Sequence, residues 1–438
     1  MNVVLFGATG DLAARHLLPS LGLLLERGEP AEGLTVAALG REAITTDEYT
    51  RRVASILVAD GRLSQLGRRN LLGTLRYHQI DLGRPDSVAA ALPGQACVVY
   101  LALPPWVLVP ALNALAAAGL PAESTLVFDK PYGEDEKSAR DLDHMLSVQF
   151  GDAFIFRADH FLYHAMSRDV MAYRFSDARY ASIWDAGHID RVSITWDEAS
   201  GVGARAAYLD RTGTLRDMHQ SHLLQYLALV TMDDPHRAGT SIAGEKEKVL
   251  AAVRPSLIEP QLVLGRYTAG RTRDGLHHAY VDGADVDPDR RTETFASVTL
   301  QLEHPDWTGV PFTLRSGKAL GTRDRAIEVV FRGLRPGMTN AIRFEMDSPG
   351  VMIEEVRDQE VLRYRHRIGT GRAGHSLPAS ASLFRDIFAK DDRLALSSEE
   401  IASSWRTIDR IRAVWRATGS PLHEYPAGSS GPMSMPEP

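Results

Sequence analysis

The chain has 438 residues, enough for two or three domains of ordinary size, and its apolar (44%) and charged (24%) fractions are those of an ordinary globular protein. A net charge of -7 argues against nucleic acid or an anionic membrane surface as a partner. No apolar run reaches the about 20 residues that span a bilayer. A lone cysteine, Cys97, and a strand-like start without a signal peptide favour the reducing cytoplasm.

A glycine-rich turn follows the first expected strand. Residues 2–6 have the pattern of a buried parallel strand, and Gly-Ala-Thr-Gly-Asp-Leu-Ala at 7–13 leads into a helical run at 14–27. This order is the context of a dinucleotide-binding fingerprint, because glycines let the backbone approach a pyrophosphate and the helix N-terminus offers free N–H groups. A tight turn without a ligand is the alternative, but the βαβ pattern that follows favours the cofactor.

Strands and helices then alternate through the first third of the chain. Further strands are expected at 34–39, 75–80, 96–103, 125–128 and 153–157. Helices are expected between them, at 46–70, 85–92 and 105–118. The alternation predicts a doubly wound, Rossmann-like parallel sheet, which we assign to a cofactor-binding domain at residues 1–155.

Two strand ends of this domain carry residues that bear on ligand binding. Arg41 and Glu42 follow the second strand, where an acid holds the ribose hydroxyls of NAD and an arginine accommodates the extra phosphate of NADP. Arg41 therefore favours NADP, with NAD as the weaker alternative. Lys130 follows the strand at 125–128, at the sheet edge where ligands bind, although a solvated loop lysine would fit as well.

The second part of the chain changes character. Longer strands of alternating polarity are expected at 191–198, 295–303, 312–315, 326–332, 341–346 and 350–356. Helices are expected at 165–174, 218–230, 383–390 and 398–418. This pattern predicts an α+β domain at residues 156–438, with a large, mostly antiparallel sheet covered by helices.

The stretch 216–225, Arg-Asp-Met-His-Gln-Ser-His-Leu-Leu-Gln, begins one of these helices. Asp217 would lie in the first turn, where the helix dipole favours negative charge, and His222 would lie one turn further along. His222 could be a general base held on a rigid helix. Alternatively, Asp217 could be an N-terminal cap and His222 a hydrogen-bonded core histidine, and the spacing alone leaves both interpretations open.

Seven motifs in the same order resemble the glucose-6-phosphate dehydrogenase family over nearly the whole chain. They are the stretches at 7–13, 100–105 (Tyr-Leu-Ala-Leu-Pro-Pro), 129–133 (Asp-Lys-Pro-Tyr-Gly), 157–160 (Arg-Ala-Asp-His), 216–225, 309–312 (Gly-Val-Pro-Phe) and 314–320 (Leu-Arg-Ser-Gly-Lys-Ala-Leu). The resemblance implies an NADP-dependent oxidation of the anomeric carbon of a sugar or sugar phosphate to a lactone, within carbohydrate metabolism and the pentose phosphate pathway.

The resemblance also implies roles for individual residues. His222 would accept the proton of the C1 hydroxyl, for which the ordinary histidine pKa of about 6.5 is suited, and Asp159 would orient it. The cofactor would contact Gly7, Thr9, Gly10, Asp11, Leu12, Arg41, Asp81, Leu82 and Lys130. The substrate would contact Lys130, His160, His164, Glu198, Asp217, Lys318 and Arg323. No metal site is expected, because the histidines are not clustered with acids at ligand spacing.

One segment departs from the family pattern. The family's Asp-His-Tyr-Leu-Gly-Lys reads Asp-His-Phe-Leu-Tyr-His at 159–164, so that Phe161 loses a hydroxyl, Tyr163 narrows the space and His164 replaces a charged lysine. Glucose 6-phosphate could still be held by His160, Lys318 and Arg323. We favour a pocket retuned for another sugar, because each lost charged hydrogen bond is worth about 1.5–3 kcal/mol.

A second class of function remains. The chain could be a catalytically silent homologue that binds NADP and a sugar as a regulatory or structural subunit. The presence of both Asp159 and His222 argues against it, since a binder needs no proton-accepting pair. By resemblance, we also expect a homodimer or a dimer of dimers, with no nucleic-acid or membrane partner.

Overall fold

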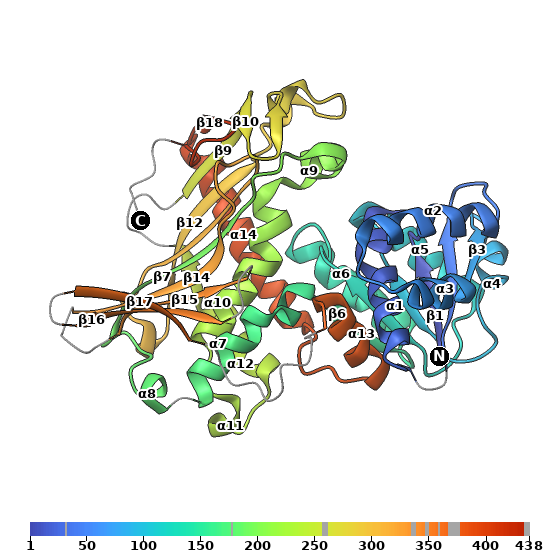
Figure 1. Ribbon diagram of the computed structural model, residues 1–438, viewed down its shortest axis with the longest axis horizontal. Helices are drawn as coiled ribbons and strands as arrows, with labels where there is room; N and C mark the ends of the chain where they lie inside the picture. Colours follow the sequence, from blue (N-terminus) through green and yellow to red (C-terminus); the bar gives the residue numbers. More distant parts are fainter. Residues whose placement is uncertain are drawn as a thin grey trace. The chain divides into compact units, whose positions relative to one another are not determined.

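The computed structural model describes residues 1–30, 33–176, 178–255, 262–333, 339–346, 350–357, 360–366 and 377–432 (Figure 1). The chain divides into two compact units, Met1–Tyr163 with Gly374–Ser398, and His164–Ala373 with Glu399–Pro438. The domain boundary expected after residue 155 differs from this division. The late helix α13 (Ala379–Ala389) packs on helices of the first unit, a long-range return that local sequence patterns do not reveal.

The first unit is built on a six-stranded parallel sheet in the order β3-β2-β1-β4-β5-β6. The strands are β1 (Asn2–Phe6), β2 (Thr35–Gly40), β3 (Leu75–Gln79), β4 (Val98–Leu101), β5 (Thr125–Asp129) and β6 (Phe154–Ala158). Strand β4 is buried along its whole length and β1 nearly so, as expected for a sheet covered on both faces. The predicted doubly wound, Rossmann-like sheet is confirmed.

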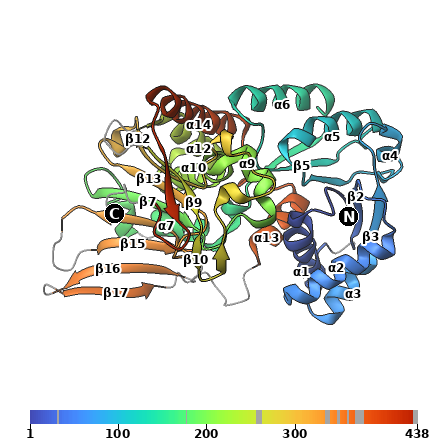
Figure 2. The ribbon, with the colours of Figure 1, turned by 90° about the horizontal axis from the view of Figure 1, so that it is seen from above.

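Helices cover both faces of this sheet. Figure 2 shows α1, α2 and α3 on one face and α4, α5 and α6 on the other. The helical segments are η1 (Ala13–Leu17), α1 (Leu18–Glu26), α2 (Thr46–Asp60), α3 (Gln65–Thr74), α4 (Pro85–Ala89), α5 (Pro105–Ala118), α6 (Glu136–Gln149) and η2 (His160–Tyr163). The single helix expected at 46–70 is two helices, because Gly61 ends α2 with a left-handed φ of 70° and Ser64 caps α3.

The second unit contains a ten-stranded sheet in the order β17-β16-β15-β14-β7-β13-β12-β9-β18, with β8 paired to β12. The strands are β7 (Ile189–Asp197), β8 (Val253–Pro255), β9 (Leu262–Thr268), β12 (Phe295–Leu302), β13 (Phe312–Gly317), β14 (Arg325–Phe331), β15 (Thr339–Glu345), β16 (Val351–Arg357), β17 (Glu360–His366) and β18 (Leu422–Pro426). Only the β7–β13 and β9–β18 pairs are parallel among these described strands. The predicted large, mostly antiparallel sheet is confirmed.

Helices pack against this sheet, as Figure 1 shows for α7 and α10. The main helical segments are α7 (Ala165–Ser176), α9 (Ala206–Thr214), η4 (Leu215–Leu223), α10 (Leu224–Thr231), α12 (Ile242–Ala252) and α14 (Ser398–Thr418). η4 contacts β13, α7 contacts β15, and α10 lies against both α7 and α12. Short elements, among them α8 (Ala178–Ala181), α11 (Pro235–Ala238) and the β10–β11 hairpin (Gly270–Thr272 and Gly275–His277), complete the described part of this unit. No helix among the described residues is long and apolar enough to cross a membrane.

The C-terminal end of α10 is anchored by buried side chains. They donate hydrogen bonds to its last carbonyl oxygens as follows: Arg174 to Leu229 (2.6 Å) and Met232 (2.5 Å), Trp184 to Val230 (2.8 Å), and Trp307 to Thr231 (2.9 Å). These carbonyl groups have no partner within the helix, so each bond satisfies a buried acceptor. Because α10 continues η4, the same bonds fix the position of the stretch that carries Asp217 and His222.

Candidate active site

The glycine turn at the end of β1 lies where the strand order reverses. β1 pairs with both β2 and β4, so the turn faces the switch point at which such sheets bind ligands. Gly7 has a φ of 72°, and a Cβ added there would lie 2.2 Å from the Ala102 carbonyl oxygen. Only glycine fits this position. The Gly10 N–H donates to the Gly7 carbonyl at 2.9 Å, which closes the turn before the helix begins.

The other residues expected at the cofactor lie around this edge of the sheet. Thr9, Gly10 and Asp11 are exposed and Leu12 is half-buried. Asp11 forms an exposed ion pair with Arg15 at 3.1 Å. After β3, Asp81 is exposed, and its carboxylate accepts a hydrogen bond of 2.9 Å from the backbone of the loop that contains the half-buried Leu82. These side chains and the N-terminus of the helix that follows the turn form a surface that suits a dinucleotide.

Glu42 and Arg41, the acid and the arginine after β2, differ in whether their side chains have partners. The Glu42 carboxylate accepts a 2.6 Å hydrogen bond from Arg52, and this bond lowers the pKa of Glu42. Arg41 is exposed, and within the described part of the chain its guanidinium forms no hydrogen bond or ion pair. The arginine is therefore available to an anionic ligand, while the acid that would favour NAD is already engaged.

A buried carboxylate stands beside Lys130. Asp129 accepts hydrogen bonds of 2.8 Å from Tyr100 and from the Lys130 N–H, and one of its oxygens lies 3.9 Å from His160 Nδ1. Burial raises the pKa of Asp129, but the hydrogen bonds and the His160 charge outweigh it and leave this pKa lowered. The Lys130–Pro131 peptide is cis. Asp129 and Tyr100 are absent from the predicted site, although both belong to the motifs that carry the family resemblance.

The segment after β6 is tightly packed. Asp159 is fully buried, and its Oδ1 accepts a 3.0 Å hydrogen bond from the Phe161 N–H. Tyr163 is buried as well, and its phenol lies beside the Asp386 carboxylate of α13, with burial as the main cause of its raised pKa. Tyr163 therefore fills space within the first unit, and its expected effect on a sugar pocket stays a prediction.

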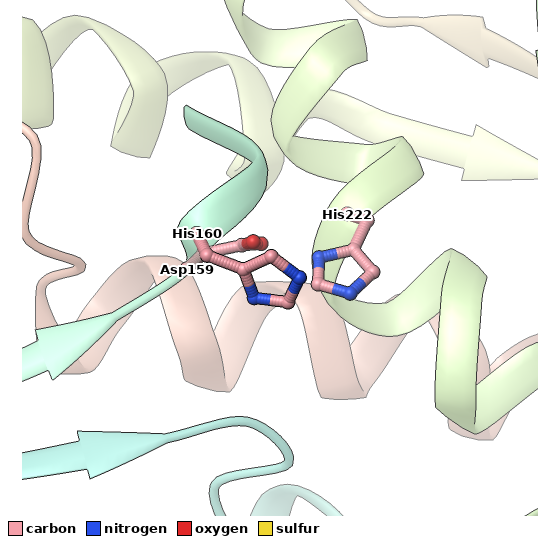
Figure 3. Close-up of side chains that lie close together, drawn as sticks. All are labelled: Asp159, His160 and His222. Carbon is pink, nitrogen blue, oxygen red and sulfur yellow. The ribbon is translucent and has the colours of Figure 1, made fainter. Parts of the chain in front are cut away.

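His222 and Asp217 both lie on η4, which is a π-helix rather than the expected α-helix and begins at Leu215. In a π-helix the hydrogen bonds join residues five apart. Asp217 and His222 are five residues apart, so they lie closer to the same face of this helix than they would in an α-helix. Figure 3 shows His222 on η4, and Asp159 and His160 on the chain that follows β6.

Asp217 is held by neighbours on α9 and the turn before it. It is buried, with 1% of its surface exposed, and it lies 3.4 Å from both Arg205 Nη2 and Tyr208 Oη. The capping interpretation is wrong, because Thr214 occupies the N-cap position of η4. The Asp217 charge is the main cause of the raised pKa of Arg205, and Glu198 contributes in the same direction. Arg205 thus links two predicted sugar ligands, and the sequence alone gave no reason to select it.

Glu198 and Lys318 stand side by side at the ends of the parallel strands β7 and β13, and their side chains form an ion pair. The Lys318 backbone is fixed by bonds to Thr294 (2.9 Å) and from the Tyr425 hydroxyl (2.8 Å). Arg323 is exposed after this turn, and the half-buried His164 lies with its ring 6.4 Å from that of Trp196. Within the second unit, therefore, Glu198, Asp217 and Lys318 lie around Arg205 and the end of β13.

The second histidine of η4 has a structural role. His219 is 1% exposed, its Nε2 lies 3.2 Å from the Leu314 carbonyl oxygen, and burial lowers its pKa to about 4. His219 is therefore neutral at pH 7 and donates to β13.

This pKa predicts a pH dependence of stability. Below pH 6.5 the unfolded chain binds a proton at His219, whereas the folded chain does not bind it until about pH 4. The free energy of unfolding should therefore fall by about 3 kcal/mol as the pH decreases from 6.5 to 4. His219→Gln keeps a donor for Leu314 and should flatten the decline. Denaturant titrations of both proteins at several pH values test this, and equal slopes would contradict it.

Comparisons with known proteins agree with this architecture. The chain matches the family models "Glucose-6-phosphate dehydrogenase, NAD binding domain" at residues 4–168 and "Glucose-6-phosphate dehydrogenase, C-terminal domain" at residues 171–437. The glucose-6-phosphate 1-dehydrogenase of Mycolicibacterium smegmatis is 32% identical, over 99% of this chain and 94% of that protein. The Bacillus subtilis enzyme is 30% identical, over 98% and 94%.

Solved structures show the same fold. A glucose-6-phosphate 1-dehydrogenase from Mycobacterium avium superposes with a TM-score of 0.80 at 27% identity, covering 98% of this chain and 94% of that one. A glucose-6-phosphate dehydrogenase in complex with glucose 6-phosphate gives a TM-score of 0.83 at 24% identity, over 99% and 95%. Both domains and the full-length relatives lead to one conclusion: the chain belongs to the glucose-6-phosphate dehydrogenase family.

Proposed function

We propose that the protein is an NADP-dependent dehydrogenase that oxidises the anomeric carbon of a sugar or sugar phosphate to a lactone. The observation that carries this proposal is the presence of Asp159 and His222, both buried, within the family's motifs in a chain that matches both family domains. A silent NADP- and sugar-binding homologue, the alternative, would have no use for a buried proton acceptor and its carboxylate.

In the proposed reaction, NADP bound at the glycine turn supplies the acceptor for the C1 hydride. His222 takes the proton of the C1 hydroxyl, and Asp159 orients the imidazole and stabilises its charged form. Asp217 and Glu198 accept hydrogen bonds from sugar hydroxyls, and their positions are fixed by Arg205 and Lys318. Lys130 follows β5 at the same edge of the sheet as the glycine turn, and it contacts both cofactor and sugar. This set of residues binds, orients and deprotonates, which is all that hydride transfer requires of the protein.

The preference for NADP is proposed to depend on Arg41. Arg41→Ala should raise the KM for NADP about tenfold to a hundredfold, the scale of one or two charge-assisted bonds, and leave the KM for NAD nearly unchanged. Arg51→Ala is the matched control, since Arg51 is an exposed arginine of α2 whose guanidinium, among the residues that the structure describes, bonds only the Asp47 carbonyl of its own helix. Steady-state kinetics with both cofactors measure this. An equal rise for NADP and NAD would contradict a phosphate contact.

The sugar is proposed to differ from glucose 6-phosphate. Phe161 has no hydroxyl to offer, Tyr163 lies beside Asp386 within its own unit, and His164 replaces the ammonium group of a lysine with an imidazole ring. Lys318, paired with Glu198, and Arg323 remain as cations for a phosphate.

A substrate panel tests both the reaction and the sugar. Purified protein with NADP is assayed for reduced nicotinamide absorbance on glucose 6-phosphate, other sugar phosphates, glucose and related free sugars. We expect turnover, with a higher kcat/KM on another sugar than on glucose 6-phosphate. Efficient and selective use of glucose 6-phosphate would reject the retuned pocket. Intact NADP binding with no turnover on any sugar would favour the silent homologue. Size-exclusion chromatography of the same sample tests the proposed dimer.

A further inference from the structure

A basic cavity of about 260 Å³ lies in the second unit at the N-terminal end of η4. Its walls come from the junction of α9 and η4, from the segment before β12 and from the last turns of α14. None of its lining residues is among those proposed above to bind cofactor or sugar. Six of the lining residues are arginines, namely Arg211, Arg216, Arg290, Arg291, Arg412 and Arg416.

The charges of this cavity do not balance. Two acids line it, so the arginines exceed them by four, and an excess of two remains when the adjoining partners of Arg290 and Arg412 are included, namely Asp287 (3.4 Å) and Asp409 (3.9 Å). Asp210 is buried and engaged by Arg290 at 2.7 Å, and Glu293 is buried and accepts a 3.0 Å hydrogen bond from the Leu215 N–H, with a pKa that burial raises. The pKa of Arg412 is lowered, first by burial and then by the charges of two neighbouring arginines. Cationic side chains that are clustered despite burial and mutual repulsion are typical of sites that bind an anion.

An aromatic donor completes the cavity wall. The guanidinium of Arg291 lies 5.4 Å from the centre of the Trp415 ring. The Nε1–H group of Trp415 is buried and has no hydrogen-bond partner within the part of the chain that the structure describes. Indole nitrogen can only donate, so this group requires an acceptor. An anion in the cavity would supply one.

We propose that this cavity binds a compact multivalent anion of phosphate chemistry, such as pyrophosphate or a small bisphosphorylated metabolite. Guanidinium groups match phosphate oxygens in pairs, and several of them can surround one such anion. The volume of about 260 Å³ suits a compact anion better than a dinucleotide.

The site adjoins the helix that carries the proposed catalytic residue. Glu293, in the cavity wall, holds the first N–H of η4, and Arg216 donates a 2.6 Å bond to the Thr212 carbonyl at the same junction. Arg216 directly precedes Asp217. An anion that binds Arg216 would therefore shift the start of η4, which carries Asp217. If Asp217 binds sugar as proposed, the anion would change the affinity for sugar, and sugar would change the affinity for the anion by the same factor.

Pyrophosphate is the probe for the binding test, titrated into the full-length protein without sugar or NADP and followed by calorimetry and tryptophan fluorescence. We expect saturable binding that Arg412→Gln weakens at least tenfold. The matched control is Arg237→Gln, in which a 78% exposed arginine of the same unit loses the same charge and binding should not change. Trp415→Phe should lose most of the fluorescence change, and because it removes the indole donor it should also weaken the binding measured by calorimetry.

Folding of the variants is checked by thermal unfolding without pyrophosphate. Arg412→Gln should not have a lower melting temperature than wild type, because it removes one of several cations that repel each other. If its melting temperature is lower, Arg291→Gln, at an exposed position of the cavity, provides a second variant. Pyrophosphate that binds at the glycine turn or the sugar site would bind wild type and both variants equally, and that result would overturn the proposal. Because no sugar turnover is measured, failure of the proposed reaction would leave this test unaffected.

Discussion

His222→Asn is expected to lower kcat by about 10²–10⁴-fold, the usual contribution of a positioned general base, with little change in the KM for NADP. The side chain is 1% exposed on a helix that is fixed at its far end by the bonds of Arg174, Trp184 and Trp307. Asparagine keeps polarity and approximate size at this position but cannot accept a proton at neutral pH. The loss should therefore appear in the chemical step, as a slower single-turnover reduction of NADP.

The matched control lies on the same helix. His219→Gln removes the other buried imidazole of η4, whose hydrogen bond is to the Leu314 carbonyl, and it should change acid stability while kcat stays within a few-fold of wild type. Asp159→Asn should lower kcat less than His222→Asn, because it misorients the base without removing it. If His222→Asn retains more than a tenth of wild-type kcat on the best sugar, the base is another residue.

The parts of the fold that are coded locally could be predicted from the sequence. The first strand, the glycine turn and the helix after it follow directly from an apolar run, two glycines and a periodic pattern. The helices at 105–118 and 398–418 have the predicted bounds. The packing position of an element that depends on distant partners could not be predicted, as the helix expected at 383–390 shows. α13 joins the first unit because it packs on α1 and η2, and no feature of its own sequence specifies these partners.

Some residues of the candidate site could likewise be predicted from the sequence, and others could not. Glu198 and Lys318 follow two strands that pair in parallel, β7 and β13, and this pairing places them at one sheet edge. They were selected by family resemblance, because the predicted antiparallel sheet did not imply that they would be close. Arg205 was missed because an exposed-looking arginine in a turn gives no sign that its charge will face Asp217. The π-helical form of η4 was missed as well, since its hydrophobic pattern does not distinguish a five-residue from a four-residue hydrogen-bond spacing.

Lys246→Met is expected to lower the free energy of unfolding by about 3–5 kcal/mol, the largest stability loss that we predict for this chain. Lys246 and Glu400 form an ion pair of 2.8 Å in which both side chains are 0% exposed, and Lys246 also donates to Gln225 at 2.9 Å. The pair joins α12 to α14 and, through Gln225, to α10. Methionine fills the space of the lysine stem, so the loss comes from leaving the Glu400 carboxylate buried without its cation.

Two further variants separate this cause from a general loss of charge. Lys137→Met removes a lysine whose side chain is 84% exposed and whose partner, Asp141, is 64% exposed, and it should leave the free energy of unfolding nearly unchanged. The double variant Lys246→Met with Glu400→Leu removes both buried charges and should recover much of the stability, because a packed apolar pair avoids the desolvation penalty. Chemical denaturation of the four proteins measures these differences. A double variant as unstable as Lys246→Met alone would mean that the hydrogen bond to Gln225, rather than the ion pair, holds α12 to the helix that continues η4.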